Sequence, residues 1–186
     1  IAEILEELNF EQAIYVIKLL DSELTSDILM ELDEDDREKI LQNLSAKEIA
    51  EEIEELDTDD AADIIGELPQ ERQQSVISQI EDEEHAQDIK ELLTYDEDSA
   101  GGLMAKELVK VNENWTVTRC VREMREQASE VTRVHSIYVV DEQDRLIGRL
   151  SLKDLLVANT QANIKEVYIP KVDYINVNED VVEVAR

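Results

Sequence analysis

The chain has 186 residues, of which 42% are hydrophobic, and a formal net charge of −29. The hydrophobic fraction excludes a disordered acidic tail and indicates a folded protein. Residues 1–100 carry 33 acidic and 6 basic side chains, whereas residues 101–186 carry 14 and 12, which predicts a boundary near residue 100. The acidic half excludes nucleic acid as a partner and favours cations or basic proteins.

Cysteine and hydropathy patterns indicate a cellular compartment. Cys120 is the only cysteine, which excludes an intrachain disulfide. The sequence has no signal-peptide pattern and no run of about 18 apolar residues. We therefore expect a soluble, cytosolic region, and any membrane part of a larger protein is expected outside this sequence.

Apolar residues recur every twelve positions in the first half. A second apolar residue precedes each of these anchors by three or four positions, which places one apolar stripe on a short helix. Each unit is too short to be stable alone, so residues 1–94 are predicted to form an acidic α-solenoid of stacked helices. The anchors are Leu8, Leu20, Leu32, Leu44, Leu56, Leu68, Ile80 and Leu92.

Residue types that start helices follow these anchors. Ser45 with Glu48 makes a capping box, and Pro69 is of a type accepted at a helix start. The predicted N-caps are Asn9, Asp21, Asp33, Ser45 and Asp57.

The second half changes to mixed structure. Paired Gly101 and Gly102 indicate a turn or a close backbone approach. The patterns that follow predict strand 108–111, a helix from Thr116 to Met124, strands 136–141 and 146–152 joined by a polar turn, and a helix near 153–156. This β-α-β-β-α order, within residues 95–160, has the outline of a CBS motif. Residues 161–186 begin a second motif, truncated here, with a strand at 172–177 and helical turns from Asp180 to Arg186.

Together these stretches resemble the MgtE family of magnesium channels. The resemblance rests on residues 93–104, 137–141, 146–148 and 150–155, and on the acidic repeat ahead of them. It implies a regulatory region on the cytoplasmic side of the cell membrane, in which Mg²⁺ bound between the acidic repeat and the CBS domain closes the pore. The implied partners are the pore domain of the same protein and a second copy, which pairs through the CBS region.

Candidate metal ligands follow from this resemblance and, for two of them, from spacing. Asp59 and Asp63 lie at i and i+4, so they share a helix face and repel each other unless a cation joins them. The family pattern adds Asp27 and Asp180 as Mg²⁺ ligands. The alternative is that Asp59 and Asp60 favour the helix N-terminus electrostatically and that Asp63 is simply solvated.

The resemblance also implies a site for ATP or another adenine nucleotide. Asp154 begins a helix directly after a predicted strand, where its carboxylate can accept the two ribose hydroxyls. Ser136 stands where relatives often carry an aromatic residue that stacks on adenine.

Catalysis is not expected. His85 and His135 lack Cys or His partners at metal spacing, and Ser151 has no evident base. Trp115 and Cys120 are interpreted as packing residues. Two other classes stay open: a soluble acidic helical-repeat scaffold, since such repeats also resemble a domain of the flagellar motor switch protein FliG, and a CBS-type adenine-nucleotide sensor without a transport role.

Overall fold

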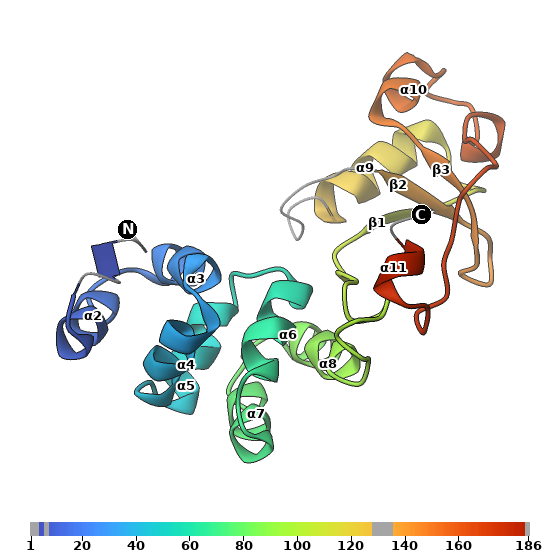
Figure 1. Ribbon diagram of the computed structural model, residues 1–186. Helices are drawn as coiled ribbons and strands as arrows, with labels where there is room; N and C mark the ends of the chain where they lie inside the picture. The colour runs from blue at the N-terminus through green and yellow to red at the C-terminus, as the bar shows by residue number, and fades with distance from the viewer. Residues whose placement is uncertain (1–3, 6–7, 128–135, 185–186) are drawn as a thin grey trace. The chain divides into compact units, whose positions relative to one another are not determined.

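The computed structural model describes residues 4–5, 8–127 and 136–184 (Figure 1). The chain divides into two compact units. The first, called here the repeat unit, comprises Ile1–Met104 together with Val177–Arg186, and the second, the sheet unit, comprises Ala105–Asn176. Among the described residues, no helix combines the length and apolar composition that a membrane span requires.

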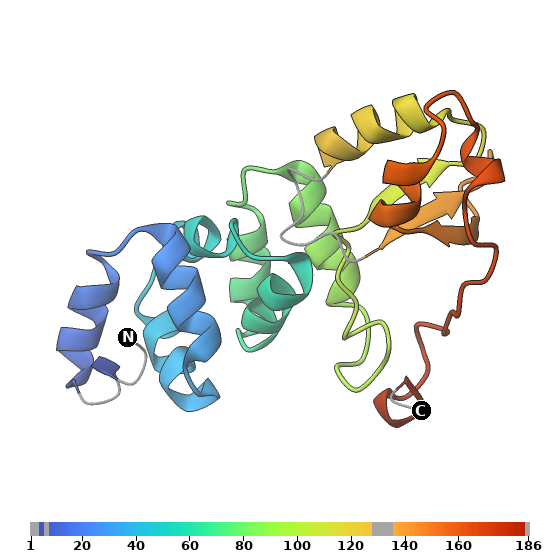
Figure 2. The same cartoon turned by 90° about the horizontal axis from the view of Figure 1, so that it is seen from above.

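The repeat unit is a series of short helices that follow one another from α2 to α8 (Figure 2). This confirms the predicted α-solenoid. The helices are α2 (Phe10–Ile17), α3 (Ser22–Glu31), α4 (Glu34–Gln42), α5 (Ala46–Ile53), α6 (Thr58–Gly66), α7 (Gln70–Ile77) and α8 (Glu83–Leu92).

Each predicted cap residue starts a helix. The caps of α2 to α6 are Asn9, Asp21, Asp33, Ser45 and Asp57, and Pro69 occupies the same position before α7. Full capping boxes form at α2 and α5. Helix α8 begins one residue later than the repeat predicts, because Asp82 is a better cap than Glu81 and accepts hydrogen bonds from two backbone N–H groups.

Helices two repeats apart pack directly on each other: α3 on α5, α5 on α7 and α6 on α8. One continuous apolar core results, because the stripe on each helix turns inward. Anchors Leu32, Leu44, Leu68, Ile80 and Leu92 are buried in this core, and Leu8, Leu20 and Leu56 pack against it partly exposed.

The sheet unit contains β1 (Val109–Asn112), α9 (Val117–Gln127), β2 (Ile137–Val140), β3 (Leu146–Leu150) and α10 (Leu152–Val157), followed by a 3₁₀ turn, η1 (Ile164–Glu166). The β-α-β-β-α order is as predicted. Strand β2 lies in the middle, parallel to β1 and antiparallel to β3. Side chains from all three strands share a core with α9 and α10, which includes Cys120, Ile137 and Leu150.

The expected strand at 172–177 is wrong. Residues 170–176 have no regular structure. Strand β3 pairs with the preceding segment only in the isolated bridge between Arg149 and Ile169, and a strand requires a continuous neighbour for its backbone groups. The chain instead pairs with the segment around Ser99: Ala100 N donates to Glu179 O, and Val181 N donates to Asp98 O, each at 2.8 Å. A short helix, α11 (Val181–Val184), follows.

Candidate functional site

Three carboxylates lie along one face of α6. Residues 61, 62, 64 and 65 are buried in the core, which turns the opposite face outward. Asp59, Asp63 and Glu67 follow one another at intervals of four on that face. We call these three residues the acidic face of α6.

Glu97, from the segment after α8, adds a fourth carboxylate. Its Oε1 lies beside Gly66, only 3.8 Å from the position that a Cβ atom at this glycine would take. Gly66 follows Asp63 by three positions and directly precedes Glu67. The structure therefore brings a carboxylate from about 30 residues away in sequence to the acidic face of α6.

The paired glycines fix the backbone on which Glu97 lies. A Cβ atom at Gly102 would lie 2.4 Å from the carbonyl oxygen of Asp96 and 2.9 Å from the Cα of Glu97. A Cβ atom at Gly101 would lie 2.5 Å from the ring of Tyr95. Both positions thus require glycine for close approach, as the sequence predicts.

The carboxylates around Asp63 affect its pKa. Burial of the carboxylate and the nearby charges of Asp59 and Glu97 raise the pKa of Asp63, whereas Arg37 lowers it. The residue as a whole is exposed to solvent. A bound cation would reduce the repulsion between these carboxylates and so lower the pKa of Asp63.

Asp180 is held near the same segment. It pairs with Ser99 in an isolated bridge, and its carboxylate accepts a 2.8 Å hydrogen bond from Val182 N. Asp27 is different: it is exposed on α3, which packs on α5, whereas α6 packs on α8. The structure thus brings Asp59 and Glu97 to Asp63 and ties Asp180 to the segment that carries Glu97, whereas Asp27 lies on a helix of another repeat.

Within the part of the chain that the structure describes, no three His, Cys, Asp or Glu side chains stand close enough to hold one metal ion between them. A single metal ion on the acidic face could therefore use one or two of its carboxylates. Such an arrangement suits Mg²⁺, which keeps much of its water shell, better than a metal that requires a full protein cage.

Sequence reasoning missed Arg37, Glu67 and Glu97. Glu67 continues the interval of four from Asp59 and Asp63, so the helical period could have identified it. Glu97 lies in a stretch that the family resemblance covers. Arg37 belongs to another repeat, and nothing local in the sequence connects it with α6.

The predicted nucleotide residues lie at one end of the β2–β3 hairpin. Ser136 directly precedes β2, and because Ile137 pairs with Leu150, it stands opposite the start of α10. Asp154 lies in the first turn of α10, where Ser151 Oγ donates to its Oδ2 at 2.6 Å. The topology thus brings Ser136 and Asp154 to the same edge of the sheet.

Trp115 and Cys120 pack as interpreted. Trp115 packs against the core of the sheet unit, and the guanidinium carbon of Arg119 lies over its ring, 4.4 Å from the ring centroid. Burial raises the pKa of the Cys120 thiol to about 11, which leaves it unreactive at neutral pH. His135 lies outside the described residues.

The two units define a class of protein: an acidic helical repeat joined to a CBS motif. The model of the MgtE intracellular N domain matches residues 1–98, and that of the CBS domain matches residues 100–160. The chain belongs to the MgtE family.

Individual relatives agree with this assignment. The magnesium transporter MgtE of Thermus thermophilus is 47% identical over 92 residues, which are 50% of this chain and 20% of the relative. The matched half of the chain thus spans about a fifth of the length of this curated relative. A crystal structure of the cytosolic domain of the Mg²⁺ channel MgtE in complex with ATP has a TM-score of 0.69 and 33% identity, covering 99% of this chain and 80% of the other. The soluble part of a magnesium transporter has a TM-score of 0.67 and 26% identity, covering 98% and 81%. These relatives are transporters and channels, and not enzymes.

Proposed function

We propose that the chain is the magnesium-sensing regulatory region of an MgtE-type magnesium channel or transporter, on the cytoplasmic side of the cell membrane. Mg²⁺ bound between the acidic repeat domain and the CBS domain closes the pore formed by the membrane part of the same protein. The observation that carries the proposal is the acidic face of α6, where Asp59 and Glu97 bring like charge to Asp63.

The chemistry of this face suits a weak Mg²⁺ sensor. A hard cation prefers carboxylate oxygens and keeps part of its water, so one or two carboxylates per ion suffice. Close like-charge pairs cost on the order of 1–4 kcal/mol each, depending on the local dielectric. Several weak sites, with Asp180 and Asp27 contributing, together supply the roughly 5.5 kcal/mol that a near-complete population shift requires.

Calorimetric titration with Mg²⁺ tests the proposal. We expect millimolar binding by the wild-type chain and a clear loss of affinity in Asp59→Ala/Asp63→Ala. The matched control is Glu34→Ala/Glu38→Ala, which removes two exposed carboxylates at the same spacing from α4. If all three proteins bind Mg²⁺ alike, the acidic face is not the sensor, and the scaffold alternative becomes the better reading.

Adenine-nucleotide binding is a second candidate function, which the arrangement of Ser136 and Asp154 favours. A solved relative carries ATP, and Asp154 offers a carboxylate in a first helical turn. Titration with ATP is expected to give weaker binding to Asp154→Asn than to the wild type. Asp173→Asn, at an exposed position on the same unit, serves as the control, and equal affinities of all three proteins would remove Asp154 from the site.

We also propose that two copies associate through the sheet unit. The repeat unit carries most of the acidic surplus, so two such surfaces repel at physiological ionic strength. On α10 of the sheet unit, Leu156 is 83% exposed and Val157 76%. Sedimentation is expected to show less association for Leu156→Glu, and no change for Leu19→Glu, whose leucine is 67% exposed on the repeat unit. The reverse result would place the interface on the repeat unit.

A further inference from the structure

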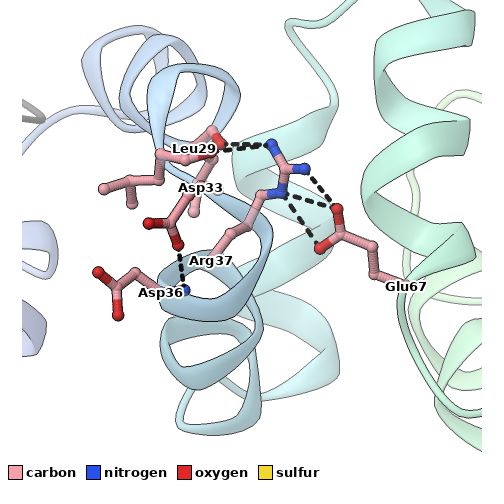
Figure 3. A network of polar contacts seen from close by, with 6 residues as sticks. Leu29, Asp33, Asp36, Arg37 and Glu67 are labelled. Carbon is pink, nitrogen blue, oxygen red and sulfur yellow. Dashed lines mark hydrogen bonds and ion pairs between the residues drawn. The ribbon is translucent and has the colours of Figure 1, made fainter.

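An ion pair lies at the end of the acidic face of α6. Arg37, on α4, donates from Nε to both carboxylate oxygens of Glu67, at 2.9 and 3.1 Å, and Nη2 also contacts Oε1 (Figure 3). The side chains are only 13% and 21% exposed. This two-pronged geometry is the strong form of a carboxylate–guanidinium contact.

The guanidinium is held in place from a third helix. Its Nη1 donates to Leu29 O at 3.0 Å and reaches Leu32 O at 3.5 Å, at the end of α3. Asp33 caps α4 by accepting from Asp36 N at 2.9 Å, which sets the first turn on which Arg37 follows. Arg37 is therefore fixed at both ends and cannot move freely to other carboxylates.

This fixed positive charge stands beside the predicted metal ligands. Glu67 follows Asp63 by about one helical turn, so the guanidinium that pairs with Glu67 stands at the end of the same face. Both members of the pair act on Asp63, Arg37 by attraction and Glu67 by repulsion. The row of three carboxylates thus has a resident cation at the end that Glu67 occupies.

We propose that Arg37 is a built-in counter-cation of the acidic face: by pairing with Glu67 it withdraws this carboxylate from metal binding and sets the Mg²⁺ affinity of Asp59 and Asp63. The inference rests on the proposed function. It gives Arg37 and Glu67, which do not contact the ion, the role of setting the Mg²⁺ affinity. In this role, the pair weakens the sensor, so that it responds at a higher Mg²⁺ concentration than the same carboxylates would without Arg37.

Opposite charge changes distinguish this role from a purely structural one. Arg37→Gln removes the positive charge and frees Glu67, so Mg²⁺ should bind about three- to tenfold more tightly. Glu67→Gln leaves Arg37 without its partner, so Mg²⁺ should bind more weakly by a similar factor. Arg37→Gln/Glu67→Gln restores the local charge and should return close to the wild-type affinity.

Two further variants keep the test decisive. Arg37→Lys keeps the charge without the fork, so it should lower thermal stability while leaving the Mg²⁺ affinity near that of the wild type. Circular dichroism identifies any variant that fails to fold. If Arg37→Gln is among them, the question is still decided by Glu67→Gln, which should bind Mg²⁺ more weakly, and by Arg37→Lys, which should bind it as the wild type does.

Mg²⁺ titration of the full chain by calorimetry, at low and at physiological salt, measures these affinities. Affinity changes of opposite sign that shrink with salt support the proposal. Weaker binding in both single variants, or no change in Glu67→Gln, overturns it and leaves the pair a structural clamp. Asp59→Ala/Asp63→Ala belongs in the same series: if that variant binds Mg²⁺ as the wild type does, the proposed function itself fails, which is a different result from the failure of the ion-pair proposal alone.

Discussion

The repeat unit and the sheet unit bury their apolar residues in different ways. In the repeat unit, the most extensive packing joins helices two repeats apart, and nearly all of the acidic surplus of the chain lies in residues 1–100. In the sheet unit, the core closes through strands far apart in sequence, such as Val109 with Ile137, and acidic and basic residues are nearly balanced. The surplus is thus a property of one unit and not a general requirement of the chain. The repulsion between these acidic residues opposes compaction, and a bound cation would reduce this repulsion.

The largest expected effect concerns the two cores. Ile64→Ala in α6 and Ile137→Ala in β2 each remove a side chain that is 0% exposed, so each should lower the free energy of unfolding by about 2–5 kcal/mol. Hydrogen exchange should separate them. Ile64→Ala should speed exchange mainly in α6 and α8, because repeats depend on their neighbours, whereas Ile137→Ala should speed it throughout the sheet. Equal spreading in both variants would contradict the difference between the units.

A smaller effect is expected at the turn that carries Glu97. Gly102→Ala places a Cβ atom against the backbone of Asp96 and Glu97, so the free energy of unfolding should fall by about 1–3 kcal/mol and the Mg²⁺ affinity should fall with it. Gly66→Ala is the control. Its Cβ atom meets only ordinary contacts, at 3.8 Å and beyond, and alanine should stabilise α6 by up to about 1 kcal/mol. Chemical denaturation measures the free energy of unfolding of both variants. A Gly102→Ala variant as stable as the wild type would contradict the close approach.

The smallest effect concerns pH. Lys18, which donates a 2.7 Å hydrogen bond, and Ser45 lower the pKa of Glu48 from 4.5 to about 2. The ionised form thus stabilises the fold above pH 4.5, and this contribution is lost as the pH falls toward 2. Glu48→Gln should cost less than about 1 kcal/mol at neutral pH, because the pair is exposed. The difference from the wild type should vanish near pH 2.

The sheet unit offers a matched variant for this pH test. The backbone N–H and the guanidinium of Arg145 lower the pKa of Asp141, so Asp141→Asn should show the same sign. Thermal unfolding across this pH range measures both variants. A difference from the wild type that grows in acid would contradict these assignments.

The twelve-residue spacing was enough to predict the helices and their caps, because the apolar stripe and the N-cap preference are local properties. The order of strands and helices along the sheet unit could be predicted in the same way, from local patterns of apolar and polar residues. The strand at 172–177 failed because strand formation depends on a neighbour and not on local pattern alone. At the site, Asp59 and Asp63 could be paired from their interval of four. The positions of Glu97 and Arg37 relative to α6 depend on contacts between segments far apart in sequence, which no local signal encodes.

Hydrogen exchange with and without Mg²⁺ tests the central claim, that a divalent cation acts on the acidic face of α6, most directly. At ~10 mM Mg²⁺, a concentration suited to weak carboxylate sites, we expect slower exchange in α6 and in residues 95–101. The sheet strands should change little, and Asp59→Ala/Asp63→Ala should abolish the response. Unchanged exchange in α6, or the same slowing in the double variant, would contradict the claim.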